Sequence, residues 1–241
     1  MTTVSSVMDE VALSCGVAVP GSWIAATTKR TYQELHSILR VTVREMLDRV
    51  DWPDPITLDA TITGTGATAY DLPADFRRLA FDDLAVYETT TDRRPCIPVS
   101  SNGAWTHLNE IGSAGGERFY KITGNASDAY DISFYKALET GSVVKVSYVS
   151  NNWLKHDSVA SDAWEGADDT LLLPSELVRT GVIWRFKAQK GLPYEAVMNE
   201  YEGKLARLAN ESRGRRVINF GSPLYDGKPM RVPVPDYIPT S

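Results

Sequence analysis

The spacing of hydrophobic residues along this chain of 241 residues changes twice. Up to about residue 54 the apolar residues recur every three or four positions, which is the period of an α-helix with one buried face. Between residues 56 and 150 they fall in short runs bounded by Gly, Asn and Asp, which is typical of β-strands. From Leu172 the helical spacing returns. The pattern therefore predicts helices, then strands, then helices.

Two helices are predicted before the strands. The first is short, ends before Gly16 and has Ser5 or Ser6 as its N-cap. The second covers residues 28–49, and the prolines of "DWPDP" (51–55) end it because proline cannot continue a helix. The expected buried faces consist of Val4, Val7, Met8, Val11 and Cys15 in the first helix and Leu35, Ile38, Leu39, Thr42 and Met46 in the second.

The central section is predicted to form short strands. Alternation is clearest in "SVVKVSYVS" (142–150), which places Val144, Val146 and Tyr148 on one face of a half-buried strand. The segment "TGTGATA" (63–69) has the glycines of a phosphate-binding loop, but neither the Lys of such a loop nor a helix start follows it. We interpret it as a turn between strands.

A helical hairpin is predicted where the helical spacing returns. Pro174 suits the first turn of a helix, Gly191 ends that helix, and Pro193 begins the next one. Glycine is unfavourable inside a helix, so at Gly181 we expect another helix to approach closely, beside Trp184. The second helix has an apolar stripe of Tyr194, Val197, Met198, Tyr201, Leu205 and Leu208, whereas the first is expected to keep Arg179, Arg185, Lys187 and Lys190 off its stripe.

These elements predict an α+β protein, with a β section inserted between two halves of a helical bundle. One hairpin cannot cover its own apolar faces, so we expect residues 1–54 and 152–211 to pack together as the bundle. Residues 55–151 are expected to form an inserted antiparallel β domain, and residues 212–241 an extended C-terminal arm.

The predicted arm is rich in proline, yet it contains too many apolar residues for a solvated linker. In extended form it reaches at most about 95 Å, which is enough to contact another protein. Arg213, Arg215 and Arg216 precede its apolar residues; they suit the end of a helix in water, or contact with an acidic partner or DNA phosphate. The side chains expected to bind a partner are Val217, Ile218, Phe220, Leu224, Tyr225, Met230, Val232, Val234, Tyr237 and Ile238.

Composition and charge narrow the function classes. A net charge of −6 argues against a surface built as a whole to hold nucleic acid. Cys15 and Cys96 are too few for a disulfide framework, and no secretory signal pattern is present, so we expect a protein kept in a reducing cytoplasm. No stretch approaches the roughly 20 apolar residues of a membrane span, so we expect a soluble protein without a membrane partner.

Patterns for catalysis or metal binding are weak. His36, His107 and His156 are far apart and match no zinc-ligand spacing. The stretch "SDAWEGADDT" (161–170) gathers acidic residues, but it lacks the alternation of a calcium loop, and we interpret it as a solvated acidic loop. We therefore expect no enzyme activity, no metal and no cofactor.

Several stretches, taken in order, resemble the head-to-tail adaptor (neck or connector) proteins of tailed bacteriophages. The resemblance covers about residues 30–210, and it is the serial order of the stretches that gives it weight. The stretches are "MLDRVDW" (46–52), "YDLPADFRRL" (70–79), "RFYKITGN" (118–125), "VVKVSYVS" (143–150) and "DDTLLLPSELVRTGVIWRFKAQKGLPYEAVMNEYEGKL" (168–205).

The resemblance implies a structural virion protein that joins the DNA-filled capsid to the tail. Members of this family form a ring, usually of twelve subunits, under the portal, and a C-terminal segment docks on the portal protein. The implied partners are further copies of the chain, the portal, a stopper or tail protein below, and double-stranded DNA that passes without sequence recognition. The implied location is the neck of the virion, after assembly in the host cytoplasm. An acidic channel wall fits this role because it repels DNA phosphates.

Two other function classes stay open on the residues alone. A carbohydrate-binding or host-adhesion module of the tail would expose aromatic side chains of the β section for stacking on sugars, although aromatics that alternate along strands mostly form core. A hydrolytic tail component would bring paired acids or a nucleophile into one cleft. The aromatic candidates are Trp105, Tyr120, Tyr130, Tyr135 and Tyr148.

Overall fold

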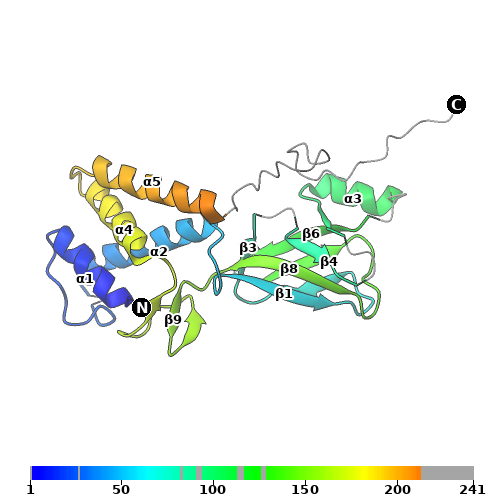
Figure 1. The fold of residues 1–241 in the computed structure, drawn as a ribbon, viewed down its shortest axis with the longest axis horizontal. Helices are drawn as coiled ribbons and strands as arrows, with labels where there is room; N and C mark the ends of the chain where they lie inside the picture. The colour runs from blue at the N-terminus through cyan, green and yellow to red at the C-terminus, as the bar shows by residue number, and fades with distance from the viewer. Residues whose placement is uncertain are drawn as a thin grey trace, which may run out of the picture.

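The computed structural model describes residues 2–26, 28–81, 84–90, 94–112, 117–125 and 129–212. Its fold is α+β, with four of the described helices at one end of an elongated molecule and most strands at the other (Figure 1). The described helices are α1 (Val4–Ser14), α2 (Arg30–Arg49), α3 (Asn102–Ile111), α4 (Ser175–Gln189) and α5 (Glu195–Ser212). The described strands are β1 (Thr57–Thr63), β2 (Ala69–Asp71), β3 (Phe76–Leu79), β4 (Val86–Glu88), β5 (Ile97–Pro98), β6 (Phe119–Asn125), β7 (Ala129–Phe134), β8 (Val143–Ser150), β9 (Leu154–His156), β10 (Val159–Ser161) and β11 (Thr170–Leu171).

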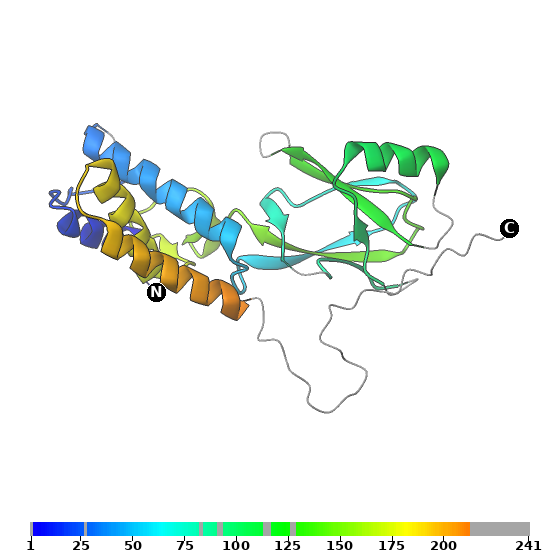
Figure 2. The ribbon, with the colours of Figure 1, turned by 90° about the horizontal axis from the view of Figure 1, so that it is seen from above.

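Helix α4 is central to the helical end, where it packs against α1, α2 and α5. Gly181 in α4 is buried, and a Cβ at this position would lie 2.5 Å from Thr42 in α2 and 2.8 Å from Tyr201 in α5. The predicted close approach is confirmed, and two helices rather than one meet this glycine. Figure 2 shows α2 and α5 extending side by side toward the strands.

The starts of the first two helices differ from the prediction. The N-cap of α1 is Thr3, whose Oγ1 accepts a hydrogen bond from the backbone N–H of Ser6 at 3.2 Å, so the expected cap at Ser5 or Ser6 is wrong. Helix α2 begins at Arg30, two residues later than predicted, and ends at Arg49, before the two prolines, as predicted.

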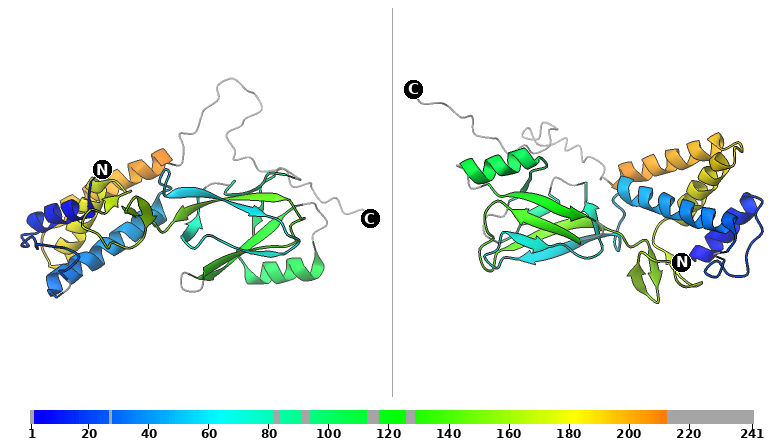
Figure 3. Two further views of the ribbon diagram at one scale, coloured as in Figure 1. Left: turned by 90° about the horizontal axis from the view of Figure 1, so that it is seen from below. Right: turned by 180° about the vertical axis from the view of Figure 1, so that it is seen from behind.

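The segment 152–211, assigned to the helical bundle, begins with short strands that the sequence pattern does not predict. Strands β9, β10 and β11 form a small antiparallel sheet with β9 in the middle. Leu154 and Leu171 from this sheet are buried against the helices, and the β9–β10 hairpin projects from them (Figure 3). Strands of two or three residues are too short to show alternation in a sequence.

The other strands form two four-stranded sheets. In one, β8 is the central strand, with β1 on one side and β3 and β4 on the other. Val144, Val146 and Tyr148 of β8 are buried, as the alternation predicts. In the other sheet the order is β2-β7-β6-β5, and β5 pairs with β6 in parallel. The predicted all-antiparallel β domain is therefore wrong at this edge.

Helix α3 corrects the prediction of strands alone between residues 56 and 150. The side chain of Ser101 caps it by accepting a hydrogen bond from the backbone N–H of Ala104 at 3.3 Å. None of its residues is buried, and Ile111 is 71% exposed. An α-helix without a fully buried stripe leaves little hydrophobic periodicity for a sequence to reveal.

Two hydrophobic cores follow from this arrangement. We use "helical part" for α1, α2, α4, α5 and β9–β11, and "β part" for β1–β8 with α3. Ile56, just before β1, and Val149, near the end of β8, are buried in the core of the helical part. Ile62 and Val144, at the other ends of the same two strands, are buried in the core of the β part. Strands β1 and β8 thus run from one core into the other.

Candidate functional site at the junction of the helical and β parts

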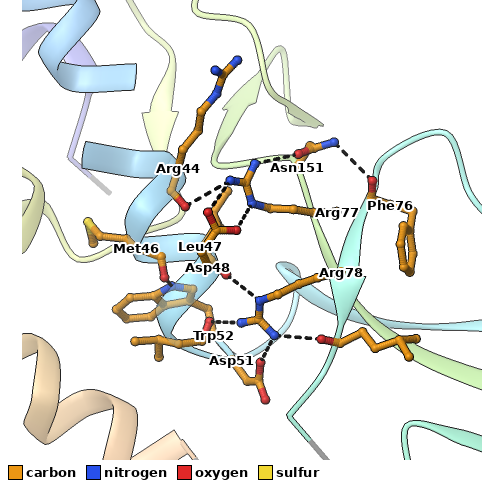
Figure 4. Close-up of polar contacts among 12 residues, drawn as sticks. Arg44, Met46, Leu47, Asp48, Asp51, Trp52, Phe76, Arg77, Arg78 and Asn151 are labelled. Atoms are coloured by element: carbon orange, nitrogen blue, oxygen red, sulfur yellow. Dashed lines mark hydrogen bonds and ion pairs between the residues drawn. The ribbon is translucent and has the colours of Figure 1, made fainter. Parts of the chain in front are cut away.

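Helix α2 ends where the β part begins, and an arginine of β3 contacts its last turn (Figure 4). Arg78 donates hydrogen bonds to the carbonyl oxygens of Leu47 (3.1 Å) and Val50 (3.0 Å), which belong to the helix end where intrahelical donors run out. Its Nη1 also pairs with Oδ1 of Asp51 at 2.7 Å, and the two side chains are only 17% and 15% exposed. Arg78 therefore caps α2 and joins it to β3.

The preceding residue, Arg77, makes a second contact with α2. Its guanidinium forms a bidentate pair with Asp48 at 2.6 and 2.8 Å, and it also donates to the Arg44 carbonyl and to the Asn151 side chain at 3.3 and 3.1 Å. Adjacent strand residues normally point to opposite faces, but β3 has an irregular register with β8 at this point. The irregularity lets both arginines reach the same helix.

A carboxylate beside these arginines joins the strands of the junction. Asp75 accepts hydrogen bonds from the hydroxyls of Tyr148 (3.0 Å) and Ser150 (2.7 Å) and from the amide of Asn152 (3.2 Å). Burial and the Asp75 carboxylate raise the pKa of Tyr148 to about 12, so its hydroxyl remains a donor at neutral pH. The junction is a polar network that fixes how β3 and β8 meet.

The chain leaving α2 is also held in place. The indole Nε1 of Trp52 donates to the Met46 carbonyl at 2.9 Å, and the indole is buried. Asp51 uses its second oxygen to accept the backbone N–H of Phe81 at 2.7 Å. Together with the ion pair to Arg78, the Phe81 contact occupies both carboxylate oxygens of Asp51. These contacts restrict rotation of the end of α2 relative to β3.

Beside this network lies a cleft of about 650 Å³, lined by α2, by residues of the β part and by the segments that follow β8 and β10. Arg40 and Arg44 of α2 line it and are exposed. Buried Trp153 and Phe76 line it too, and Asp162 adds a carboxylate to the lining. The cleft is lined by charged and polar side chains, and its basic groups Arg40 and Arg44 come from α2.

The structure places Arg185 differently from the sequence prediction, which kept it off the apolar stripe. Its side chain is 12% exposed, forms an ion pair with Glu45 of α2, and lies over the rings of Trp184 (4.2 Å) and Tyr201 (5.1 Å). Burial lowers the pKa of Arg185. The aromatic rings and the carboxylate allow a guanidinium to lie between α2, α4 and α5.

The acidic loop is only partly solvated. Asp169 is 3% exposed and accepts hydrogen bonds from Nδ1 of His156 (2.7 Å) and from the backbone N–H groups of Glu165 (3.0 Å) and Gly166 (2.9 Å). Its carbonyl accepts the N–H of Val4 at 2.8 Å, at the start of α1. The interpretation as a solvated loop is thus wrong for Asp169, which connects the loop to the N-terminus, and applies to the exposed residues Asp162, Glu165 and Asp168.

The three histidines lie in different surroundings. His36 is half-buried, stacks on Trp164 with ring centroids 5.0 Å apart, and contacts the Trp23 carbonyl; burial lowers its pKa. His107 is exposed on α3, and His156 pairs with the loop. Within the described ranges no group of three or more His, Cys, Asp or Glu side chains is arranged to hold a metal ion.

The aromatic candidates for sugar stacking do not form a row. Tyr120 and Tyr148 are each 5% exposed and belong to the core of the β part. Trp105 lies on α3 rather than on a strand. The segment "TGTGATA" links β1 to β2, as expected for a turn between strands.

The partner-binding residues predicted from the sequence lie in 213–241, outside the described residues, and so do Arg213, Arg215 and Arg216. The junction residues Asp75, Arg77 and Arg78 are not among the sequence candidates. A usable indication was present in "ADFRR" (74–78), where charges crowd the start of a strand instead of alternating with apolar residues.

No protein-family model matches the chain, and a search of curated proteins finds no match. None of the described helices is both long enough and apolar enough to span a membrane.

Proposed function

We propose that the chain is a subunit of a head-to-tail adaptor ring that joins the DNA-filled capsid of a tailed bacteriophage to its tail. In this proposal residues 1–54 and 152–211 act as a helical bundle, residues 55–151 as an inserted β domain, and residues 212–241 as an extended arm that docks on the portal. The ring surrounds the DNA channel, and the protein works by its interfaces and not as an enzyme.

The observation that carries the proposal concerns the stretches that resemble adaptor proteins. Three of them, "MLDRVDW", "YDLPADFRRL" and "VVKVSYVS", meet at the junction. The first supplies Asp51 and the second Arg78, which pair at 2.7 Å, while the second and third meet through Asp75 and Tyr148. Residues that resemble a family in serial order therefore also contact one another, which supports a shared architecture over chance likeness.

The charge of the chain supports the same role. A ring of identical subunits, each with a net charge of −6, presents an acidic assembly to the DNA that passes through it. Like charges repel phosphates, so such a channel lets DNA slide where a basic wall would hold it.

The arm is the part of the proposal that one experiment tests directly. The full chain and a variant that ends at Ser212 are mixed with the portal protein of the same phage, and the particles are imaged by electron microscopy. We expect rings on the portal with the full chain and bare portals with the shortened one, because Pro233 and Pro235 favour an extended backbone that presents apolar side chains at low ordering cost. Bare portals with both proteins would overturn the adaptor role. Equal occupancy would keep that role and move the docking site to the helices.

A further inference from the structure

Two arginines of α2 differ from the others that the structure describes. Each of the other described arginines has a carboxylate, ring or other partner for its side chain. The side chains of Arg40 and Arg44 have neither an ion pair nor a hydrogen bond within the described ranges, although the chain has more acidic than basic residues. In Figure 4 the Arg44 side chain points away from the junction network. The two described arginines without an ion pair or hydrogen bond therefore both lie on α2, one helical turn apart.

The two guanidinium groups belong to one surface. Arg40 and Arg44 are four residues apart on α2, so their Cβ atoms are about 5–6 Å apart on the same face of the helix. Both line the cleft of about 650 Å³ at the junction. Val43 lies between them in sequence and is buried in the helical core, so this part of α2 is packed against the rest of the helical part. The helix thus fixes the spacing of the two Cβ atoms, and both side chains start from the same face of α2.

The rest of the cleft limits what can bind there. Asp48 is already neutralised by its bidentate pair with Arg77, and Asp162 contributes an exposed carboxylate to the lining. Trp153 and Phe76 are 6% and 2% exposed, so they offer little face for stacking a base. The lining suits a ligand with a few negative charges and an ordinary polar backbone.

We propose that this cleft binds an acidic protein segment, whose paired carboxylates contact Arg40 and Arg44. Residues i and i+2 of an extended segment are about 6.6 Å apart along the backbone, and the Cβ atoms of residues i and i+4 of a helix are about 5–6 Å apart, so acidic residues at either spacing can reach both arginines. Guanidinium groups bind carboxylates through paired, charge-assisted hydrogen bonds. The segment contacts both parts of the protein, so its binding stabilises their relative orientation.

A protein segment fits this cleft better than DNA does. A duplex carries one phosphate charge per about 1.7 Å of axis, and continuous binding requires a basic surface along several of them. The cleft offers two unpaired arginines and the negative charge of Asp162. The inference does not depend on the adaptor role, because it follows from the unpaired arginines alone.

The test measures binding of a fluorescent octaglutamate peptide to the full chain by anisotropy, with octaglutamine as the uncharged match. We expect octaglutamate to bind, octaglutamine not to bind, and the double variant Arg40→Gln/Arg44→Gln to weaken binding by at least about tenfold. Arg30→Gln is the matched control, because Arg30 is on the same helix, is 91% exposed and lies outside the cleft lining. It should leave the affinity unchanged.

Further arms of the experiment decide the alternatives. The double variant Arg40→Lys/Arg44→Lys keeps the charge and should bind with intermediate affinity, which separates a charge requirement from misfolding. Self-association of the full chain that disappears in the glutamine double variant would support the site and identify a second copy as its source. Equal affinity of the wild type and the glutamine double variant for octaglutamate would overturn the proposal, and so would tighter, equally arginine-dependent binding of a DNA duplex.

Discussion

The helical part and the β part obtain their cores in different ways. The buried residues of the helical core extend from Val4 to Leu205, on both sides of the inserted strands, whereas those of the β core all lie between Ile62 and Tyr148. A core whose residues all come from one continuous stretch needs no contacts with residues outside that stretch. A core drawn from both sides of an insertion must wait for contacts of high sequence separation. The comparison implies that the β part is the more autonomous unit.

The largest expected effect is in isolated fragments. A fragment of residues 55–151 contains the whole β core, and we expect it to give a cooperative thermal transition with a β-type circular dichroism spectrum. A fragment of residues 152–212 contains α4 and α5 but lacks α1 and α2, which cover α4, and we expect it to be unfolded. A folded 152–212 fragment beside an unfolded 55–151 fragment would reverse the comparison.

A smaller but still large effect is expected from buried aromatic side chains in the intact chain. Tyr201 is fully buried in the helical core and Phe134 is 1% exposed in the β core. Replacing either by alanine should reduce the free energy of unfolding by about 3–5 kcal/mol, the usual cost for a buried aromatic ring. Hydrogen exchange distinguishes the two variants. Tyr201→Ala should accelerate exchange in the helices while β8 stays protected, and Phe134→Ala should do the opposite. Equal acceleration throughout the chain would mean that the two cores unfold as one.

The junction should give effects of intermediate size. Arg78→Ala removes hydrogen bonds to the carbonyls of Leu47, Val50 and Leu79 and a largely buried ion pair with Asp51, so we expect a loss of about 2–3 kcal/mol in chemical denaturation. Arg77→Ala is the comparison: its ion pair with Asp48, which is 54% exposed, is worth only about 0.2–1 kcal/mol because solvent screens it. The hydrogen bonds of Arg77 to the Arg44 carbonyl and to Asn151 are lost as well, and we expect the total loss to stay below that of Arg78→Ala. Arg78→Ala should also separate the unfolding of the two parts into two transitions. Similar losses in both variants would contradict the view that burial decides the strength of the junction.

Much of the fold could be predicted because long amphipathic elements repeat the same hydrophobic spacing several times. Helices α2, α4 and α5 each run for four turns or more, and the alternation in β8 continues over most of the strand. The errors fall on elements without such repetition. Helix α3 has no buried residue, and β9 to β11 have two or three residues each, so their formation depends on neighbours that no local pattern shows.

The site was harder to predict than the fold for a different reason. Arg78 and Asp51 are 27 residues apart, and their meeting depends on where β3 lies after folding. A sequence with many charged residues offers many possible pairs, so it does not identify which arginines remain unpaired. Arg185 shows the same limit, because its place over Trp184 depends on the approach of α2 and α5 to α4. The close approach at Gly181 could be predicted, because glycine is unfavourable inside a helix and its presence there indicates that another element packs against it.

The smallest expected effect is a pH dependence confined to the helical part. The hydrogen bond to Asp169, together with the charges of Asp169, Asp157 and Glu165, raises the pKa of His156. Burial alone would raise the pKa of Asp169, but bonds from Gly166, His156 and Glu165 lower it overall. The histidine contribution is therefore complete below the unfolded pKa of about 6.5 and is lost as pH rises through the folded value, while the aspartate contribution is lost only as pH falls below about 4.

We therefore expect His156 to contribute a fall in the midpoint of the helical transition between pH 6 and pH 8, whereas the half-buried His36, whose pKa is lowered, contributes a rise over the same range. The β transition should change less. In His156→Gln this fall should shrink, because an uncharged amide cannot titrate. His107→Gln, at an exposed histidine of the β part, is the matched control and should melt like the wild type at both pH values. Since the loop that holds Asp169 also binds the start of α1 through the Val4 N–H, the lost stability should appear first as faster hydrogen exchange in α1. An unchanged pH profile in His156→Gln would show that the neutral imidazole holds Asp169 as well as the charged one does.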